Sequence, residues 1–453
     1  ALQANTEGHN NTAVGLEALQ TNTTGDANTA MGTGALALAT TADNNTGIGR
    51  SALGANTTGT RNTAVGMSAG TAITTGSYNV LMGAFTGDAI TTGEQNAAFG
   101  DAALSACTTG TDNVAIGDQA LKVNTTANQN TAVGSSALVA NTTGVQNVAV
   151  GDFVLDANTT AHYNTGLGSQ ALSGNTTGAS NVAVGHRSLL VNTTAADNTG
   201  VGASSLAANT TGASNTGLGS GALASNTTAS NNVAVGKSAL LLNTTGAGNT
   251  AVGTFTLDAN TTGATNTAIG YAALSANTTA TSNVAVGNTA LLANTTGDMN
   301  IAVGSGALTS NVAGDRSVAI GHNALTTQNP SGNADMYNIG IGLNAGFAVT
   351  TGTENVLIGG LAGDALTNGG QNVAVGHAAL SAEDGHGQNV AIGYLALVAQ
   401  NAGATAYNTA VGSQAGAAVT TGVQNTFVGG LAGDATDDGT NNVAVGFEAL
   451  SAN

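Results

Sequence analysis

The sequence predicts an all-β protein: a single elongated parallel β-solenoid, or β-roll, of about 26 coils. Three observations predict it. The glycine that ends motifs such as NTAVG (11–15) and NVAVG (147–151) recurs at every seventeenth position over most of the chain. Each repeat is rich in β-branched and turn-forming residues and is too short for a pair of helices. An apolar content of 41% supports a core that suits small side chains.

The spacing of this glycine, which we call the coil glycine, defines the organisation of the chain. From Gly15 through Gly32 and Gly49 to Gly321, every step has the same length. We therefore expect regular 17-residue solenoid coils over residues 1–321.

The same solenoid is expected to continue over residues 322–453 with two short loop insertions. The step from Gly321 to Gly342 is longer than the regular one, and so is the step from Gly393 to Gly412. The extra residues place the insertions at about 326–338 and 399–408.

A short strand is expected directly before each coil glycine. The residue before that glycine is always apolar, and the residue two positions earlier is Thr, Val or Ile in every coil except at Ala97. Because strand side chains alternate, both are expected to face the core, with Val14 and Val150 as examples. The glycine itself suits a corner with positive φ. A second strand is expected in stretches such as ALVANTTG (137–144).

The Asn that opens the motif is present in 25 of 26 coils, with Ser317 as the exception. Identical Asn side chains that stack from coil to coil can hydrogen-bond along the stack. We therefore expect a structural Asn ladder. Its members include Asn11, Asn28, Asn62, Asn147, Asn181, Asn283, Asn389 and Asn442.

The fourth and seventh residues after the coil glycine vary together. Where the fourth is Leu, as at Leu138, the seventh is usually Asn, as at Asn141. Where the fourth is Gly, as at Gly70, the seventh is usually large and apolar, as at Ile73. Close-packed interiors penalise voids and overpacking, so the two positions are expected to share one core space.

The middle residue of the strand is expected to face outward, yet it is never polar. It is Ala or Gly in 23 of 26 coils and large and apolar in the other three. An outward stripe of small apolar residues predicts contact with another copy of the chain around a rotational axis. The predicted interface residues include Ala13, Ala64, Leu81, Ala149, Ala183, Gly217, Ala251, Ala285, Leu357 and Phe427.

The phrases NVAVG, NVAIG and SVAIG (317–321) resemble the head repeats of YadA-like trimeric autotransporter adhesins. The longer phrase NTAVGxxALxxNTTGxxN is similar to β-solenoid repeats of phage tail fibres. The resemblance covers essentially the whole chain. It implies a left-handed β-roll packed as a homotrimer, in an extracellular, cell-surface or virion location. The 17-residue period is longer than the usual adhesin unit, and no coiled-coil stalk or membrane anchor is expected within residues 1–453.

Composition argues against several partners. The net charge is −18, with only six Lys and Arg residues, so nucleic-acid binding is not expected. No run of 18 apolar residues exists, so no membrane contact is expected within this segment. Cys107 is the single cysteine and cannot form an intrachain disulfide.

Catalytic residues are not evident, and the chain is predicted not to be an enzyme. The six His residues fall at variable, turn-like positions and are expected to be surface polar residues. No cofactor or metal site is expected. The acidic stretches AEDGHG (382–387) and TDDGTNN (436–442) leave calcium as a minor alternative, although Asp-Gly clusters are more often plain turns.

These observations favour a structural extracellular protein, a rigid segment of a fibre or surface adhesin built from stacked repeats. The expected partner is the chain itself, as a trimer or a filament, with a host or environmental surface ligand as a further candidate. A subunit that stacks end to end is one alternative, and a solenoid that binds ice or glycans is another. The chain opens with ALQAN and stops with ALSAN, the same point of the repeat, so a segment of a longer protein is expected.

Overall fold

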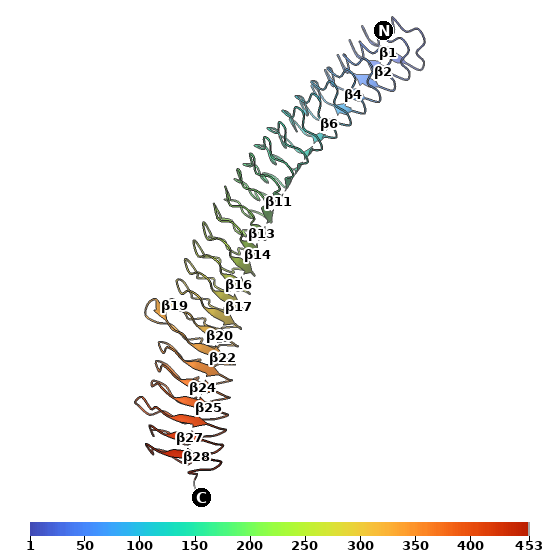
Figure 1. Cartoon of the computed structure of the whole chain (residues 1–453). Helices are drawn as coiled ribbons and strands as arrows, with labels where there is room; N and C mark the ends of the chain where they lie inside the picture. The colour runs from blue at the N-terminus through green and yellow to red at the C-terminus, as the bar shows by residue number, and fades with distance from the viewer. Residues whose placement is uncertain (452–453) are drawn as a thin grey trace. The chain divides into compact units, whose positions relative to one another are not determined.

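The computed structural model describes residues 1–451 and is all-β, with no helix in that range. It is a parallel β-solenoid of about 26 turns at the expected spacing (Figure 1). Within the described range, therefore, no helix is present that would be able to cross a membrane. The chain divides into two compact units, Ala1–Thr228 and a second unit that begins at Ala229.

The first unit contains 13 strands of three residues, one in each coil. Each strand pairs in parallel with the strand of the next coil, so the arrows of consecutive coils lie side by side in Figure 1. The strands are β1 (Thr12–Val14), β2 (Thr29–Met31), β3 (Thr46–Ile48), β4 (Thr63–Val65), β5 (Val80–Met82), β6 (Ala97–Phe99), β7 (Val114–Ile116), β8 (Thr131–Val133), β9 (Val148–Val150), β10 (Thr165–Leu167), β11 (Val182–Val184), β12 (Thr199–Val201) and β13 (Thr216–Leu218).

The second unit repeats this arrangement and adds the short pair β19 and β21, which belongs to the first insertion. The predicted range 322–453 lies in this unit, and its last two residues fall outside the described residues. The strands are β14 (Val233–Val235), β15 (Thr250–Val252), β16 (Thr267–Ile269), β17 (Val284–Val286), β18 (Ile301–Val303), β19 (Gly314–Asp315), β20 (Val318–Ile320), β21 (Ala334–Asp335), β22 (Ile339–Ile341), β23 (Val356–Ile358), β24 (Val373–Val375), β25 (Val390–Ile392), β26 (Thr409–Val411), β27 (Thr426–Val428) and β28 (Val443–Val445).

The coils stack in register, so each position of the repeat forms a column. In the first pair, Thr12 lies beside Thr29 and Val14 beside Met31. The coil glycine takes a backbone conformation that other residues rarely adopt. Gly15 has φ +126°, and a Cβ on it would lie 2.7 Å from the carbonyl oxygen of Gly32. The column therefore requires glycine for two reasons, the conformation and the close approach of the next coil.

Apart from the short pair β19 and β21, each coil has one strand, and the predicted second strand is absent from the described coils. Residues 137–144 form turns, because Ser136 and Leu138 adopt left-handed conformations with φ values of 55° and 53°. A left-handed residue turns the chain out of the extended form that strand pairing needs. The predicted second strand was wrong for this reason.

The strand faces are also reversed relative to the prediction. Val14 and Val150 were expected in the core, but their side chains are 55% and 37% exposed. The middle residue, such as Ala149, is fully buried. We call the middle residues of the strands the inner row, and the residues directly before the coil glycines the outer row.

The narrow interior explains the reversal. Leu36 fills the space opposite the inner row, and a Cβ on Gly47 would lie 3.3 Å from Leu36 Cγ. A methyl group or a hydrogen is therefore all that most coils can accept at this position. The β-branched residues face outward because the interior has no room for them.

The fourth and seventh positions after the coil glycine both point inward, as the covariation predicts. Leu138 and Asn141 are fully buried, and so is Ile73. The volume exchange between these positions therefore takes place within one core.

Candidate functional surfaces and site

The predicted interface stripe lies in the interior of the coils. Its members other than the first are buried, and Ala13 of the first coil is half-buried. Buried side chains cannot form a contact surface for a second chain, so this prediction was wrong. The residues that were wrongly predicted to form the interface are Ala13, Ala64, Leu81, Ala149, Ala183, Gly217, Ala251, Ala285, Leu357 and Phe427.

The outer row is the apolar surface that the strands present instead. Every member is Val, Ile, Leu, Met or Phe, and many are more than a third exposed, such as Met31 (43%) and Ile116 (39%). A second row of Thr, Val and Ile lies two residues earlier and also points outward, as Val80 does. Each unit therefore carries an apolar sheet face along its stacked strands.

The Asn residues form a buried hydrogen-bonded ladder. The backbone N–H of Asn164 donates to Asn147 Oδ1 (3.0 Å), and Asn147 Nδ2 donates to the carbonyl oxygen of Ala161 (2.9 Å). Each Asn thus joins the next coil and also bridges its own coil. The predicted ladder residues Asn11, Asn28, Asn62, Asn147, Asn181, Asn283, Asn389 and Asn442 all make the coil-to-coil bond.

The exceptional Ser317 is explained by the first insertion. In a regular coil the ladder Asn donates to a carbonyl further along the same coil, as Asn300 does to Gly314. In the coil of Ser317, the side chain bonds to Gln328 instead. Gln328, at the seventh position after the coil glycine, donates from Nε2 to Ser317 Oγ (3.0 Å) and accepts from Asn338 Nδ2 (3.0 Å).

A second Gln accompanies the second insertion. Gln400 occupies the same position of its coil, and its Oε1 accepts from Asn408 Nδ2 (2.6 Å). In both coils with insertions, a longer amide therefore replaces the Asn of regular coils and bonds to the following ladder Asn.

In most coils a pair of Thr residues follows the Asn at the seventh position after the coil glycine, as Thr142 and Thr143 follow Asn141. Only one Thr of each pair contributes to an exposed row. Thr142 Oγ1 donates to the carbonyl oxygen of Thr159 in the next coil (3.0 Å). Thr143 is exposed. The first hydroxyl of each pair stabilises the stack, and the second faces solvent.

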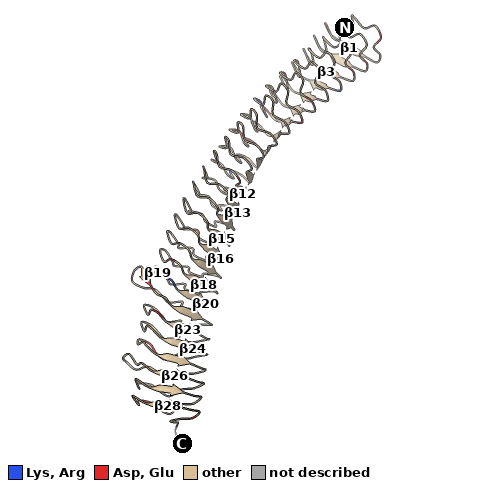
Figure 2. Cartoon of the chain, viewed as in Figure 1, with Lys and Arg blue, Asp and Glu red and all other residues tan. Residues whose placement is uncertain are grey.

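Charged residues are sparse and scattered, and Figure 2 is tan over most of the chain. Arg316 pairs with Asp335 of β21, and its guanidinium lies 5.8 Å from the centre of the Tyr337 ring. This ion pair attaches the first insertion to the preceding coil, which contains Arg316.

Five of the six His residues lie in turns or loops outside the strands and form no ion pair with a carboxylate of residues 1–451. His9, His186, His322 and His377 are exposed, and His162 Nδ1 accepts from the backbone N–H of Val145 (2.9 Å). His386 differs, because it lies against a buried carboxylate.

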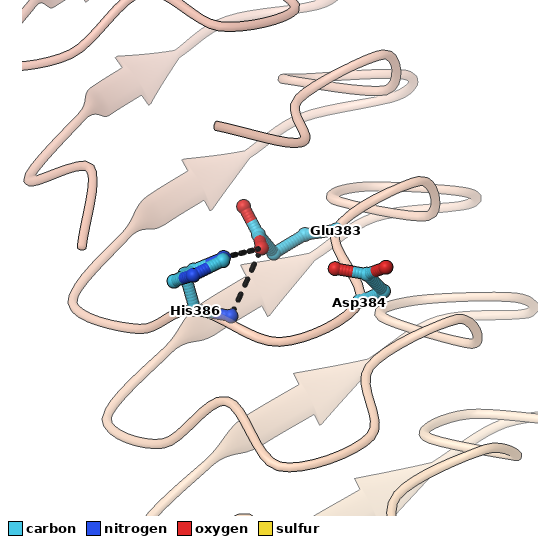
Figure 3. A group of neighbouring side chains, drawn as sticks. All are labelled: Glu383, Asp384 and His386. Atoms are coloured by element: carbon cyan, nitrogen blue, oxygen red, sulfur yellow. Dashed lines mark hydrogen bonds and ion pairs between the residues drawn. The ribbon is translucent and has the colours of Figure 1, made fainter. Parts of the chain in front are cut away.

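The side chains of Glu383, Asp384 and His386 extend from one loop, and Figure 3 shows Glu383 and His386 in contact with Asp384 to one side. One possible ligand atom from each lies within 4.8 Å of the others, and among residues 1–451 no other group of three His, Cys, Asp or Glu does so. Glu383 is fully buried, whereas Asp384 is exposed. Glu383 Oε1 accepts from the backbone N–H of His386 (3.0 Å) and lies 3.4 Å from His386 Nδ1.

Two atoms of this cluster lack a hydrogen-bond partner in the described structure, namely Glu383 Oε2 and His386 Nδ1. Burial raises the pKa of Glu383, while the backbone N–H and the ring of His386 act in the opposite direction. The loop therefore holds a carboxylate in a place where regular coils hold a neutral amide.

Sequence reasoning gave 382–387 only as a minor calcium candidate and favoured a plain turn, so it did not identify Glu383 as a buried ligand. The available signal was the register: Glu383 is the seventh residue after Gly376, the column of Asn141. A charged residue in a buried column, three residues before a His, distinguishes this coil from the others.

An open polar groove of about 540 Å³ lies beside the cluster. Its lining includes His386, Gly385, Gly370 and Tyr407. His386 thus has one side toward Glu383 and another toward solvent.

The second acidic stretch, 436–442, brings no third ligand together within the part of the chain that the structure describes. Asp437 accepts a hydrogen bond from Thr420 Oγ1 of the preceding coil. The sole cysteine, Cys107, is buried and free.

No protein-family model matches this chain, and no curated protein is significantly similar to it.

Proposed function

We propose that this chain is a structural segment of an extracellular fibre or surface adhesin, and that it associates with copies of itself. The outer row is the contact surface in this proposal. The trimer and the extracellular location follow from the resemblance of the repeats to YadA-like adhesins and phage tail fibres.

The observation that carries the proposal is the apolar outer face of a parallel sheet. Parallel sheets are nearly always covered on both faces. Here the inner row covers one face, while the outer row leaves residues such as Met31, Met82 and Leu218 more than 40% exposed. Contiguous apolar surface of this kind marks an interaction site in soluble proteins.

Repetition favours a second copy of this chain as the partner. The outer row has the same chemistry in every coil, so a matching partner must be repetitive and apolar along its length as well. The net charge of −18 does not oppose this contact at the strand face, because both outward strand columns are uncharged. The scarcity of charge on these columns supports close approach of two such faces.

The test replaces three adjacent outer-row residues, Ile116, Val133 and Val150, with Glu. These residues lie beside one another in β7, β8 and β9. The expected result is a fall in mass, measured by analytical ultracentrifugation, from an oligomer to a single chain. Far-ultraviolet circular dichroism should stay β-like, because the substituted side chains point to solvent.

Two controls make this result specific. Gln at the same three positions removes apolar area without adding charge and should weaken the association less. Glu at the exposed turn residues Gln129 and Gln146 adds charge to the same coils and should leave the mass unchanged. A wild-type chain that sediments as a monomer, or Glu variants that keep the oligomeric mass, would contradict the proposal.

A further inference from the structure

The loop of Glu383, Asp384 and His386 differs from every other turn of the solenoid. Its buried position normally holds a neutral Asn, which donates to a nearby carbonyl, as Asn141 does to Gly144 (2.9 Å). A carboxylate cannot donate, and Glu383 Oε2 has no donor of its own. A buried carboxylate with an unpaired oxygen is destabilising unless a proton or a cation neutralises it.

We propose that Glu383, Asp384 and His386 bind one divalent transition metal ion of the zinc class. Glu383 Oε1 and His386 Nδ1 are the two central ligands, and Asp384 completes the protein set. Solvent supplies the remaining position from the groove.

The geometry favours this class of ion. Two ligands at about 2.1 Å from a tetrahedral zinc ion lie about 3.4 Å apart. Glu383 Oε1 and His386 Nδ1 are separated by 3.4 Å. The carboxylate of Asp384 lies within the 4.8 Å that encloses all three ligand atoms, and its exposed side chain has solvent around it in which to rotate toward the ion.

The chemistry of the ligands separates zinc from calcium. Calcium takes six to eight oxygen ligands, and an imidazole nitrogen is a poor ligand for it. One imidazole and two carboxylates suit zinc and similar ions. The two negative charges also balance the charge of the divalent ion.

The surroundings give the loop a fixed backbone and an entry path. A side chain on Gly387 would collide with the carbonyl oxygen of Gly370, so the loop lies tightly against the preceding coil. His386 and Gly385 line the open groove of about 540 Å³, so an ion in the groove reaches the imidazole of His386 first. An entry path and a fixed ligand set are what a metal site requires.

The test is zinc titration of the whole chain by isothermal calorimetry, with cobalt(II) as a spectroscopic probe. The expected result is one bound zinc per chain and visible cobalt absorption typical of a tetrahedral site. Zinc should also raise the unfolding temperature, because it binds only the folded loop.

Glu383→Asn is the decisive variant, because Asn is the residue that regular coils carry at this position and the fold should be kept. Glu383→Asn and His386→Gln, each made singly, should weaken zinc binding by about 100-fold or more. Loss of an outer-shell partner alone costs about 10- to 100-fold, and these residues are direct ligands in the proposal. His377→Gln, which changes an exposed His of the same coil, should leave binding unchanged. Absence of zinc binding by the wild type, binding of calcium alone, or unchanged zinc binding in Glu383→Asn would overturn the proposal.

Discussion

Leu81 occupies the space that a side chain at Gly70 would need. A Cβ on Gly70 would lie 2.8 Å from Leu81 Cδ1, and a Cβ on Gly87 would lie 3.0 Å from Leu81 Cδ2. The one large inner-row residue of this region therefore lies between two glycines from successive coils. Leu357 has the same relationship to Gly346 and Gly363.

This relationship predicts strong coupling between positions 70 and 81. Leu81→Ala should cost about 2–5 kcal/mol through the cavity it leaves. Gly70→Leu alone should cost about 1–3 kcal/mol through overpacking. In the double variant the leucine introduced at position 70 no longer meets Leu81, although Ile73 stays at the seventh position. The double variant should therefore be more stable than the sum of the two single changes predicts, by about 1–3 kcal/mol.

Urea denaturation combined with hydrogen exchange over residues 63–100 measures this coupling. The control pair is Gly70→Leu with Ala149→Gly, whose sites lie several coils apart and should give additive effects. Strict additivity for positions 70 and 81 would contradict the shared core space.

The orientation of the strand predicts opposite outcomes at neighbouring residues. Ala149→Asp places a charge in the closed interior and should destabilise its coils by several kcal/mol. Val150→Asp faces solvent and should cost much less in a dissociated chain. Thermal unfolding and amide exchange in β8, β9 and β10 compare the two variants, and a larger loss for Val150→Asp would reverse the assignment of faces.

Cys107 is predicted to be chemically inert in the folded chain. It lies at the seventh position after its coil glycine, where it is buried beside the carbonyl of Gly110, and burial raises the pKa of its thiol to about 11. Since the thiolate is the reactive form, a disulfide reagent should label it only after unfolding in guanidinium chloride. Labelling in the native state at the rate of a free thiol would contradict this prediction.

The same site offers a stabilising change. Cys107→Asn restores the residue of regular coils, with Gly110 as acceptor for its amide. We expect a gain of about 0.5–1.5 kcal/mol, the contribution of one hydrogen bond, measured by the urea midpoint. Cys107→Ala, which adds no hydrogen bond, is the matched control and should not gain stability.

Asp88 and Asp258 predict a specific dependence of stability on pH. Burial is the main cause that raises the pKa of both carboxyls, and each has one oxygen without a hydrogen-bond partner. The folded chain therefore binds more protons than the unfolded chain. The contribution of these two carboxyls to the free energy of unfolding is fully present below their pKa in the unfolded chain. It is lost as the pH rises through their higher pKa in the folded chain.

The variant with Asn at both positions does not have this pH-dependent loss. Its unfolding temperature minus that of the wild type should therefore increase from about pH 3 to pH 7. Calorimetric scans across this range measure the difference. Asp101→Asn removes a charge from an exposed position and is the control. A variant that loses stability relative to wild type as the pH rises would show that these carboxylates are stabilising when ionised.

The periodicity of the sequence predicts the stacking but not the direction of the side chains. The coil glycine, the Asn ladder and the exchange between Gly70 and Ile73 all follow from spacing, because each depends on a residue meeting its counterpart in the next coil. The faces of the strand do not follow from alternation alone. Hydrophobicity favours Val150 over Ala149 for a core, whereas the cross-section of the coil, set by Leu at the fourth position, admits only the smaller residue.

The sequence offered the Glu383 stretch only as a minor calcium candidate, for a related reason. Repeats direct attention to what is constant, and this site is one departure in a column of otherwise neutral or apolar residues. Its partner His386 has no counterpart in other coils, so no periodic signal marks it. The carboxylate becomes conspicuous only when the column is known to be buried.

Gln328 and Gln400 together define a rule for lengthening a turn. Each carries one more methylene than the Asn of a regular coil, and each offers its side-chain oxygen to the next ladder Asn. The loop that follows is then free to change in length and sequence while the strand spacing on either side is kept. We expect foreign peptides to be accepted at this corner of any coil once its Asn is exchanged for Gln, which makes the solenoid a scaffold for display at chosen intervals.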